Sequence, residues 1–451
     1  MLLELKLKNF RSFYEEAVFS MLASPRQKAH DDFLIKTEGR RILPSAVIYG
    51  PNASGKTSLV MALEFLKGIV EIGHIRKQKD NVLSEMVELF PFIHDYHKYI
   101  EPTCFEITFL MEGMEVIYGL TLESRREFEN DARESKRWIA KEILTVDQKE
   151  IFLRDLDRIT LIKDKKTLKF YHEKTSSKLL ETLEAQINAN LEPTDLFLCG
   201  AFKNVVNNEL ANKVIRWFHE KLIPIMDFDE AKFEVKLPEN YTNRKYILRN
   251  KVMQAMLQHA DFGPQDIRFV LDKEDDSEQN TQLRSRYPMP GNPFGKGLDI
   301  PSELLESKGT IKMLEFSFPF VQALKHGCVL VVDELDASLH PDLVAAIVGV
   351  FNNPSINKNG AQLIFNTHNP IYLNKNIFRR DQILFVEKNR DSYTSELYSL
   401  ADFKTYGEKA VRDDERFMKN YLSGKYGAIP FVDFEAAVYQ ALSEDSKKGE
   451  R

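Results

Sequence analysis

The segment Ala46–Leu59, AVIYGPNASGKTSL, is the most informative part of this sequence. It begins as a short apolar run typical of a strand, turns through a loop that contains Gly50 and Gly55, and enters the apolar, helix-like segment Leu59–Val70. Gly50–Thr57 fits G-x-x-x-x-G-K-[ST], in which backbone N–H groups and a helix N-terminus surround phosphate oxygens. A glycine-bearing turn fits these letters by chance, but the strand before it and the helix after it favour a phosphate-binding loop, the P-loop.

Two side chains of this loop have separate roles in the prediction. Lys56 reaches the β- and γ-phosphates of a nucleotide, and the Thr57 hydroxyl is a ligand of Mg²⁺. The residues expected to bind nucleotide comprise the whole loop: Gly50, Pro51, Asn52, Ala53, Ser54, Gly55, Lys56, Thr57 and Ser58.

Composition is that of a soluble globular protein. The 451 residues are 43% hydrophobic and 29% charged, and the net charge of −6 gives no global reason to expect nucleic-acid binding. Cys104, Cys199 and Cys328 are far apart, which argues for a reducing compartment and against a zinc site or a disulfide framework. No apolar run reaches about 18 residues and the N-terminus reads as a strand, so we expect a cytoplasmic protein without a membrane segment.

An acidic pair supplies the second half of a phosphate site. Gly327–Glu334, GCVLVVDE, is an apolar strand that ends in two carboxylates, at the sheet edge where parallel sheets bind ligands. We expect Asp333 to hold Mg²⁺ and Glu334 to polarise the attacking water as general base. The alternative, a buried strand followed by surface acids, is less favoured because the same chain carries a P-loop.

A helix start lies shortly before the acidic strand. From Ile311 apolar residues recur on one helical face, and Gly327 ends the pattern. Ser307 and Gly309 stand at the N-terminus of this helix, a position that suits phosphate binding. The alternative is a simple serine cap.

The order of these motifs resembles the AAA15 branch of the ABC/SMC-like ATPases. The partial signature Ser307–Thr310 departs from the common LSGGQ, since Glu306 replaces Leu, Lys308 replaces Gly and Thr310 replaces Gln. The resemblance covers most of the chain, but its motifs are dense only in residues 1–122 and 301–430. The motifs that carry it are Asn9–Phe13 (NFRSF), the P-loop, Ser307–Thr310, Asp333–Glu334, His368 and the ending Tyr421–Pro430 (YLSGKYGAIP).

This resemblance implies roles for further residues. Arg11 corresponds to the arginine of the opening turn, and His368 to the switch histidine that contacts the γ-phosphate. Leu335–Pro341 corresponds to the D-loop, which touches the opposite subunit. Ser307 and Gly309 would contact nucleotide bound to another copy, so the resemblance implies a head-to-tail homodimer around two ATP molecules, or a larger homo-oligomer of such dimers.

The implied fold class is α/β, a P-loop NTPase with an ABC/SMC-like ATPase head and an inserted, mostly helical lid region. Residues 1–122 would be the N-terminal part of the ATPase domain, and residues 301–451 its C-terminal part. Residues 123–300 would form the insert, with Asp272–Gly297 as a mobile linker. Trp217 and Phe218 are interpreted as core or interface residues and not as base-stacking residues.

Members of this branch, such as the RloA, AbiL, PtuA and AriA types, are often one half of a bacterial anti-phage or abortive-infection pair. The resemblance therefore implies an ATP-gated regulator of a separately encoded effector, such as a TOPRIM-type or HNH nuclease. DNA or a phage protein would be the trigger. Asp413, Asp414 and Asp433 do not complete a nuclease metal set with Glu387, so we expect the effector on another chain.

Two other functions fit the same motifs. One is an SMC-like repair or recombination ATPase that clamps DNA directly, which needs a basic groove on the dimer. The other is a nucleotide-stabilised scaffold with negligible turnover, against which Glu334 counts because a scaffold needs no general base.

Overall fold

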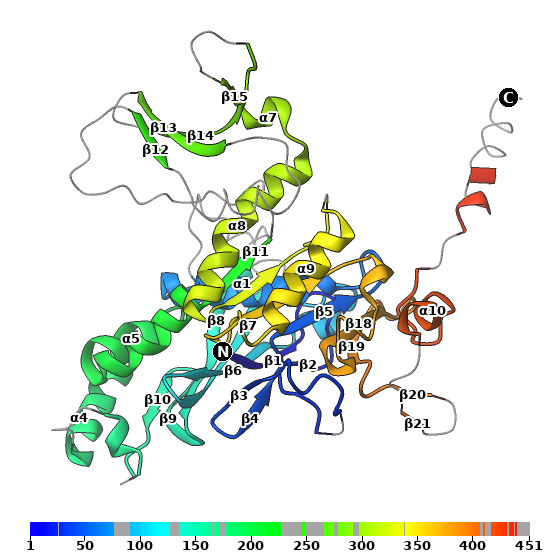
Figure 1. Cartoon of the computed structure of the whole chain (residues 1–451). Helices are drawn as coiled ribbons and strands as arrows, with labels where there is room; N and C mark the ends of the chain where they lie inside the picture. The colour runs from blue at the N-terminus through cyan, green and yellow to red at the C-terminus, as the bar shows by residue number, and fades with distance from the viewer. Residues whose placement is uncertain are drawn as a thin grey trace, which may run out of the picture.

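A computed structural model gives the fold of the chain (Figure 1). The structure describes residues 1–25, 27–75, 91–126, 135–164, 166–171, 176–226, 245–248, 266–274, 278–291, 297–337, 339–405, 409–410, 416–430, 433–436 and 438–439. Within these residues no helix is both long enough and apolar enough to cross a membrane.

A six-stranded sheet carries the P-loop. Its first five strands run parallel, and the last pairs antiparallel with its neighbour. Buried apolar residues fill the four central strands on both faces, which is why these strands read as apolar runs in the sequence. The strand order is β11 (Leu222–Ile225), β16 (Val329–Val332), β17 (Gln362–Asn366), β5 (Ser45–Tyr49), β18 (Ile383–Lys388) and β19 (Ser395–Ser399).

Successive residues of β5 face two different hydrophobic cores. Ile48 packs in the core that contains helix α1 (Lys56–Ile72), whereas Val47 packs in the core that contains α8 (Lys308–His326) and α9 (Pro341–Asn352). The period of two along the strand thus places helices on both faces of the sheet. This layered α/β arrangement is the one predicted from the P-loop.

A seven-stranded antiparallel sheet closes the first core over α1. The N-terminus, which the sequence predicts to be a strand, forms β1, and β6 and β7 are an antiparallel pair beside it. The strand order is β10 (Arg158–Leu161), β9 (Lys149–Asp155), β8 (Ser135–Val146), β7 (Met114–Arg126), β6 (Thr103–Met111), β1 (Leu2–Lys8) and β2 (Ala17–Ser20).

The prediction of a mostly helical insert over residues 123–300 is wrong for the described part. The predicted boundary at residue 122 falls inside β7, and β8 to β10 continue the same sheet. Two ionic side chains of this sheet, Glu142 and Arg154, are fully buried. Helical pieces do occur: α4 (Ser177–Asn188), η3 (Leu198–Val206), α5 (Asn208–Arg216) and η4 (Trp217–Lys221).

The predicted mobile linker Asp272–Gly297 is also corrected where it is described. It contributes to a hairpin of β13 (Asp266–Glu274) and β14 (Glu278–Tyr287), and residues 275–277 and 292–296 lie outside the described residues. In this hairpin Asp272 pairs with Asn280 across the two strands. With β12 (Lys245–Leu248) and β15 (Leu298–Pro301) the hairpin forms a separate four-stranded sheet (Figure 1).

The remaining elements are short. They are β3 (Ile35–Thr37), β4 (Arg40–Ile42), α3 (Tyr96–Tyr99), η2 (Leu168–Phe170), α7 (Ser302–Leu305), η5 (Pro370–Tyr372), η6 (Arg380–Gln382), β20 (Lys404–Thr405), β21 (Lys409–Ala410) and α10 (Phe417–Leu422).

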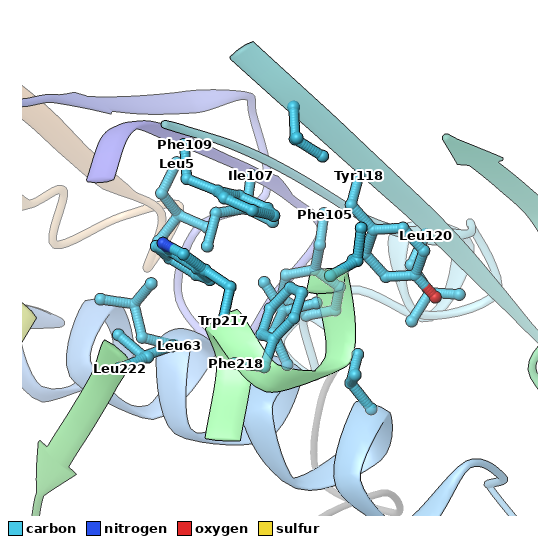
Figure 2. Packing of buried hydrophobic residues seen from close by; sticks show 14 of the residues in the cluster. Leu5, Leu63, Phe105, Ile107, Phe109, Tyr118, Leu120, Trp217, Phe218 and Leu222 are labelled. Carbon is cyan, nitrogen blue, oxygen red and sulfur yellow. The ribbon is translucent and has the colours of Figure 1, made fainter. Parts of the chain in front are cut away.

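Trp217 and Phe218 lie in the core between α1 and the antiparallel sheet, as predicted (Figure 2). The Trp217 ring stacks on Phe109 of β6 with centroids 3.9 Å apart and planes at 18°. Phe218 meets the ring of Tyr118 edge-on at 5.9 Å. These contacts tie η4 to the sheet and so fix the start of β11, the first strand of the parallel sheet.

We expect Trp217→Ala to lower the free energy of unfolding by about 3–5 kcal/mol, because it leaves a cavity against Phe109. Urea unfolding followed by circular dichroism measures this change. Leu156→Ala is the control, since Leu156 is 47% exposed and should change stability by no more than about 0.5 kcal/mol. Equal effects of the two substitutions would contradict the packing described above.

Candidate functional site

The P-loop connects β5 to α1, and its two glycines are required by close contacts. A Cβ on Gly50 would lie 2.3 Å from the Val386 carbonyl oxygen, inside β18. Gly55 has a φ of 111°, and a Cβ there would lie 2.6 Å from Ser12 Oγ. Any larger residue would displace the neighbouring strand or turn, so the loop conformation depends on glycine at both positions.

Lys56 is the buried cation of the loop, with 5% of its surface exposed. Its ammonium donates to the carbonyls of Gly50 at 2.9 Å and Pro51 at 2.8 Å, and lies 3.4 Å from His368 Nδ1. Burial lowers the pKa of Lys56 to about 8, against the opposing charges of Glu334 and Asp333. Lys56 of the free loop is therefore mostly protonated at pH 7 and loses its proton as the pH rises through about 8.

Asp333 and Thr57 meet at the carboxyl edge of the sheet. The Thr57 hydroxyl lies 3.2 Å from both carboxylate oxygens of Asp333 and donates to that carboxylate. Burial raises the pKa of Asp333, while hydrogen bonds from Asn366 and Thr57 lower it. The two residues that the sequence assigned to Mg²⁺ are thus adjacent.

Asn366 is a site residue that sequence reasoning missed. It ends β17, which lies between the P-loop strand and the acidic strand, and its amide nitrogen donates to Asp333. Its amide oxygen accepts from the Glu334 backbone N–H at 2.7 Å. The available signal was a polar residue at the end of an apolar strand, the same signal that identified Asp333.

Glu334 and His368 face each other beside the P-loop. His368 Nε2 lies 3.8 Å from Glu334 Oε1, and both side chains are partly exposed. Burial and the charge of Lys56 lower the pKa of His368, which keeps the imidazole neutral near pH 7. Glu334 has a φ of 48°, and its carbonyl accepts from Lys312 of α8 at 2.9 Å.

A cavity of about 510 Å³ lies over the P-loop and brings most of the predicted residues together. Arg11 and Ser12 of the opening turn line it. Ser395 of β19 anchors this turn and the loop, since its N–H donates to the Ser12 carbonyl at 2.7 Å and its hydroxyl to the Ser54 carbonyl at 2.5 Å. The cavity is lined by Arg11, Ser12, Asn52, Ala53, Gly55, Lys56, Thr57, Ser58, Pro91, Ile93, His94, Glu334, His368 and Lys388.

A second cavity, of about 1060 Å³, borders the P-loop on the side of the C-terminal motif. Tyr421, Ile429 and Pro430 line it together with residues 50–54 of the loop. The Tyr421 hydroxyl donates to the Ala428 carbonyl at 2.9 Å and so closes the motif on itself. The ending that resembled the AAA15 branch therefore packs beside the nucleotide loop.

Ser307 and Gly309 are not brought to the P-loop of their own chain. Neither residue lines either cavity beside that loop. Ser307 is exposed and caps α8, accepting from the Thr310 N–H at 3.1 Å.

In the predicted D-loop, Asp336 accepts from the Thr367 hydroxyl at 2.7 Å, and residue 338 lies outside the described residues.

The oxygen ligands at the sheet edge fit Mg²⁺. Mg²⁺ usually takes one or two protein oxygens and completes its shell with water and phosphate. Thr57 and Asp333 supply a hydroxyl and a carboxylate, and the part of the chain that the structure describes holds no cluster of three or more His, Cys, Asp or Glu residues suited to a metal. This ligand set suits an ion that arrives with a nucleotide.

Comparisons with known proteins agree with this geometry. The model of a family described as "AAA domain, putative AbiEii toxin, Type IV TA system" matches residues 45–374. Together with the sheet order, this match confirms the predicted α/β P-loop NTPase fold. No curated protein matches the chain.

Two solved structures are similar at low identity. An SmcHead bound to the C-winged helix domain of ScpA is 14% identical, with a TM-score of 0.41, over 88% of this chain and 97% of that one. An SMC head domain from Thermotoga maritima is 14% identical, with a TM-score of 0.35, over 88% of this chain and 98% of that one.

The lowered pKa of Lys56 predicts pH-dependent nucleotide binding. As pH rises through about 8 the free protein loses the Lys56 proton, whereas bound phosphate favours the protonated form, so ATP affinity should fall. Near pH 9 we expect a loss of up to about tenfold, measured by calorimetric titration. In Lys56→Arg, any remaining affinity should not fall over this range, because arginine stays charged. A constant wild-type affinity from pH 7 to 9 would contradict the prediction.

Asn366→Ala should leave ATP binding nearly unchanged and lower ATP turnover by about 10-fold or more, because Asp333 and Glu334 lose their common support. Steady-state phosphate release measures the effect. Asn190→Ala is the control, since Asn190 is an exposed residue after α4. A wild-type rate in Asn366→Ala would show that the acidic pair needs no such support.

Proposed function

This chain belongs to the AAA-domain family matched over residues 45–374, and on that premise we propose that it hydrolyses ATP and uses the cycle as a switch. The observation that carries the proposal is the convergence of Lys56, Thr57, Asp333, Glu334 and His368 on one sheet edge. These residues come from three separate strand ends. A purely structural role gives no reason for a buried cation, a hydroxyl–carboxylate pair and an imidazole to meet there.

Each residue has a chemical task in this proposal. Lys56 exchanges its carbonyl partners for the β- and γ-phosphates, and Thr57 and Asp333 hold Mg²⁺. When bound, Mg²⁺ supplies positive charge that stabilises the phosphate oxygens. Glu334 takes a proton from the attacking water, and neutral His368, 3.8 Å away, donates a hydrogen bond toward the γ-phosphate.

The exposed signature residues support an ATP-dependent dimer. Ser307 caps α8 away from the cavities of its own chain, so a nucleotide contact by this residue requires a second copy. We therefore propose a head-to-tail homodimer, or an oligomer of such dimers, in which each P-loop faces the Ser307 turn of the other copy. ATP would close the dimer, and hydrolysis would release it.

We assign the switch to bacterial anti-phage defence, in the AAA15 branch. The family description names a toxin of a toxin–antitoxin system, which supports a defence context. In this proposal the effector is a separate chain, such as a TOPRIM-type or HNH nuclease; Asp413 and Asp414 lie outside the described residues. DNA or a phage protein is the proposed trigger.

Glu334→Gln should bind ATP normally, lower turnover by about 100-fold or more and accumulate the closed dimer, because the general base is lost. Phosphate release and light scattering in ATP measure the two effects. Glu396→Gln, on the exposed side of β19, is the control and should behave as wild type. Unimpaired hydrolysis in Glu334→Gln would exclude Glu334 as the base.

Ser307→Arg should retain ATP binding and lose ATP-dependent dimerisation, since the larger cation blocks the contact with the second copy. Ser176→Arg is the matched control, because Ser176 caps α4 in the same way, accepting from the Leu179 N–H at 3.2 Å. Dimerisation is measured by size-exclusion chromatography in ATP. A Ser307→Arg dimer of wild-type strength would refute the contact in trans.

The effector is tested by purifying Glu334→Gln in ATP from the native host and identifying co-purifying proteins by mass spectrometry. A stoichiometric nuclease that is released by the wild-type protein on hydrolysis supports the defence regulator. Recovery of DNA alone, with binding that weakens steeply as salt rises, would favour a direct DNA clamp instead.

A further inference from the structure

The nucleotide cavity extends beyond the residues that the proposed function uses. Its phosphate end is formed by the P-loop, Glu334 and His368, and a further wall lies beyond them. A nucleotide whose phosphates lie at Lys56 must place its sugar and base along the rest of the cavity. That wall consists of Arg11, Ser12, Pro91, Ile93, His94 and Lys388.

We propose that His94 and Tyr393 form the base-recognition wall of this site, where the base of the bound nucleotide stacks on the imidazole ring of His94. Tyr393 is a positioning residue that supports His94 from behind. The inference rests on the proposed nucleotide binding and adds the group that recognises the base.

The ring of His94 is held flat by its neighbours. It stacks on the Tyr393 ring with centroids 4.6 Å apart and planes at 20°, and Phe92 contacts it edge-on at 5.4 Å. The Phe92 backbone N–H donates to the Asn9 side chain at 3.0 Å. Asn9 belongs to the same turn as Arg11, so one turn orients both the arginine and the aromatic wall of the cavity.

Tyr393 separates the two cavities beside the P-loop. His94 lines the nucleotide cavity, whereas Tyr393 lines the second cavity, and Lys388 lines both. The two stacked rings therefore stand as a partition, with the Lys388 ammonium 5.5 Å from the centre of the Tyr393 ring. A planar base that enters the nucleotide cavity meets the imidazole, backed by a second aromatic ring.

The turn that carries Tyr393 holds it in an unfavourable backbone conformation. Tyr393 has a φ of 58°, which is strained for an aromatic residue. The turn enforces it, because the Asn389 N–H donates to the Thr394 carbonyl at 2.8 Å and the Asn389 side chain accepts from the N–H groups of Asp391 and Ser392. Strain that surrounding hydrogen bonds maintain is typical of ligand-binding positions.

A stacked pair alone does not indicate a ligand site. His30 stacks on Phe33 in a similar way, with centroids 4.4 Å apart and planes at 12°, but neither residue lines a cavity at the P-loop. What distinguishes His94 is its place in the cavity that also holds Lys56. Stacking tolerates any base because every base has an aromatic face, so the wall contributes affinity for the base without strong selectivity.

The experiment compares ATP with inorganic tripolyphosphate, which has the phosphates but no base. Both are titrated with Mg²⁺ by calorimetry into wild-type protein, His94→Ala, His94→Phe, Tyr393→Ala and His30→Ala. We expect His94→Ala to weaken ATP binding about tenfold and to leave tripolyphosphate binding unchanged. Tyr393→Ala should weaken ATP binding less, and His94→Phe and His30→Ala should match wild type.

The outcomes separate this inference from the proposed function. Equal loss of both ligands in His94→Ala, or loss of neither, would overturn the base wall while the P-loop assignment stands. Wild-type protein that binds neither ligand would overturn both. His94→Phe keeps the inference testable if His94→Ala unfolds, since retained ATP affinity with an aromatic replacement supports stacking and a loss confined to ATP opposes it.

Discussion

The hydrogen bonds of Asn366 to the Asp333 carboxylate and the Glu334 N–H are the contacts on which the site depends. They exist because β17 lies between β5 and β16, so its last side chain reaches the acidic pair while β5 delivers the P-loop alongside. Parallel strands end at one sheet edge, and this edge gathers residues that lie far apart in the chain. Without that order, Glu334 and Lys56 would not share a cavity.

Support for the P-loop comes from both ends of the chain. Ser12 of the first turn and Ser395 of β19 bond to each other, and Ser395 also bonds to the loop at Ser54. The close approach of Gly50 to β18 leaves no space for a side chain. The loop is therefore shaped before any nucleotide binds, which reduces the entropy lost on binding. The first turn also holds the segment of His94, since Asn9 accepts from the Phe92 N–H. The loop before Ser395 holds Tyr393, which stacks on His94.

Local motifs were enough to propose the site because their chemistry is encoded in short stretches. The P-loop spacing, the acidic end of β16 and the serine at the start of α8 were all read from neighbouring residues, and the structure places them at strand ends and helix starts. Residues 123–300 carry no such motif in the sequence, so their strands could not be predicted in the same way. Contacts between distant residues support the structure there, as at Glu142, whose buried carboxylate accepts from the Tyr118 hydroxyl and the N–H groups of Phe197 and Leu198.

Sequence was sufficient to predict the P-loop NTPase fold class and to propose the residues of a phosphate site, since glycine, lysine and paired acids at fixed spacing have few other uses. Only the tertiary structure revealed the contacts of Asn366 and Ser395 and the stack of His94 on Tyr393. These contacts join segments that share no sequence motif. The tertiary structure also showed that Ser307 stands apart from the cavities of its own chain. A short motif encodes the local backbone, whereas the order of strands in a sheet decides which motifs meet.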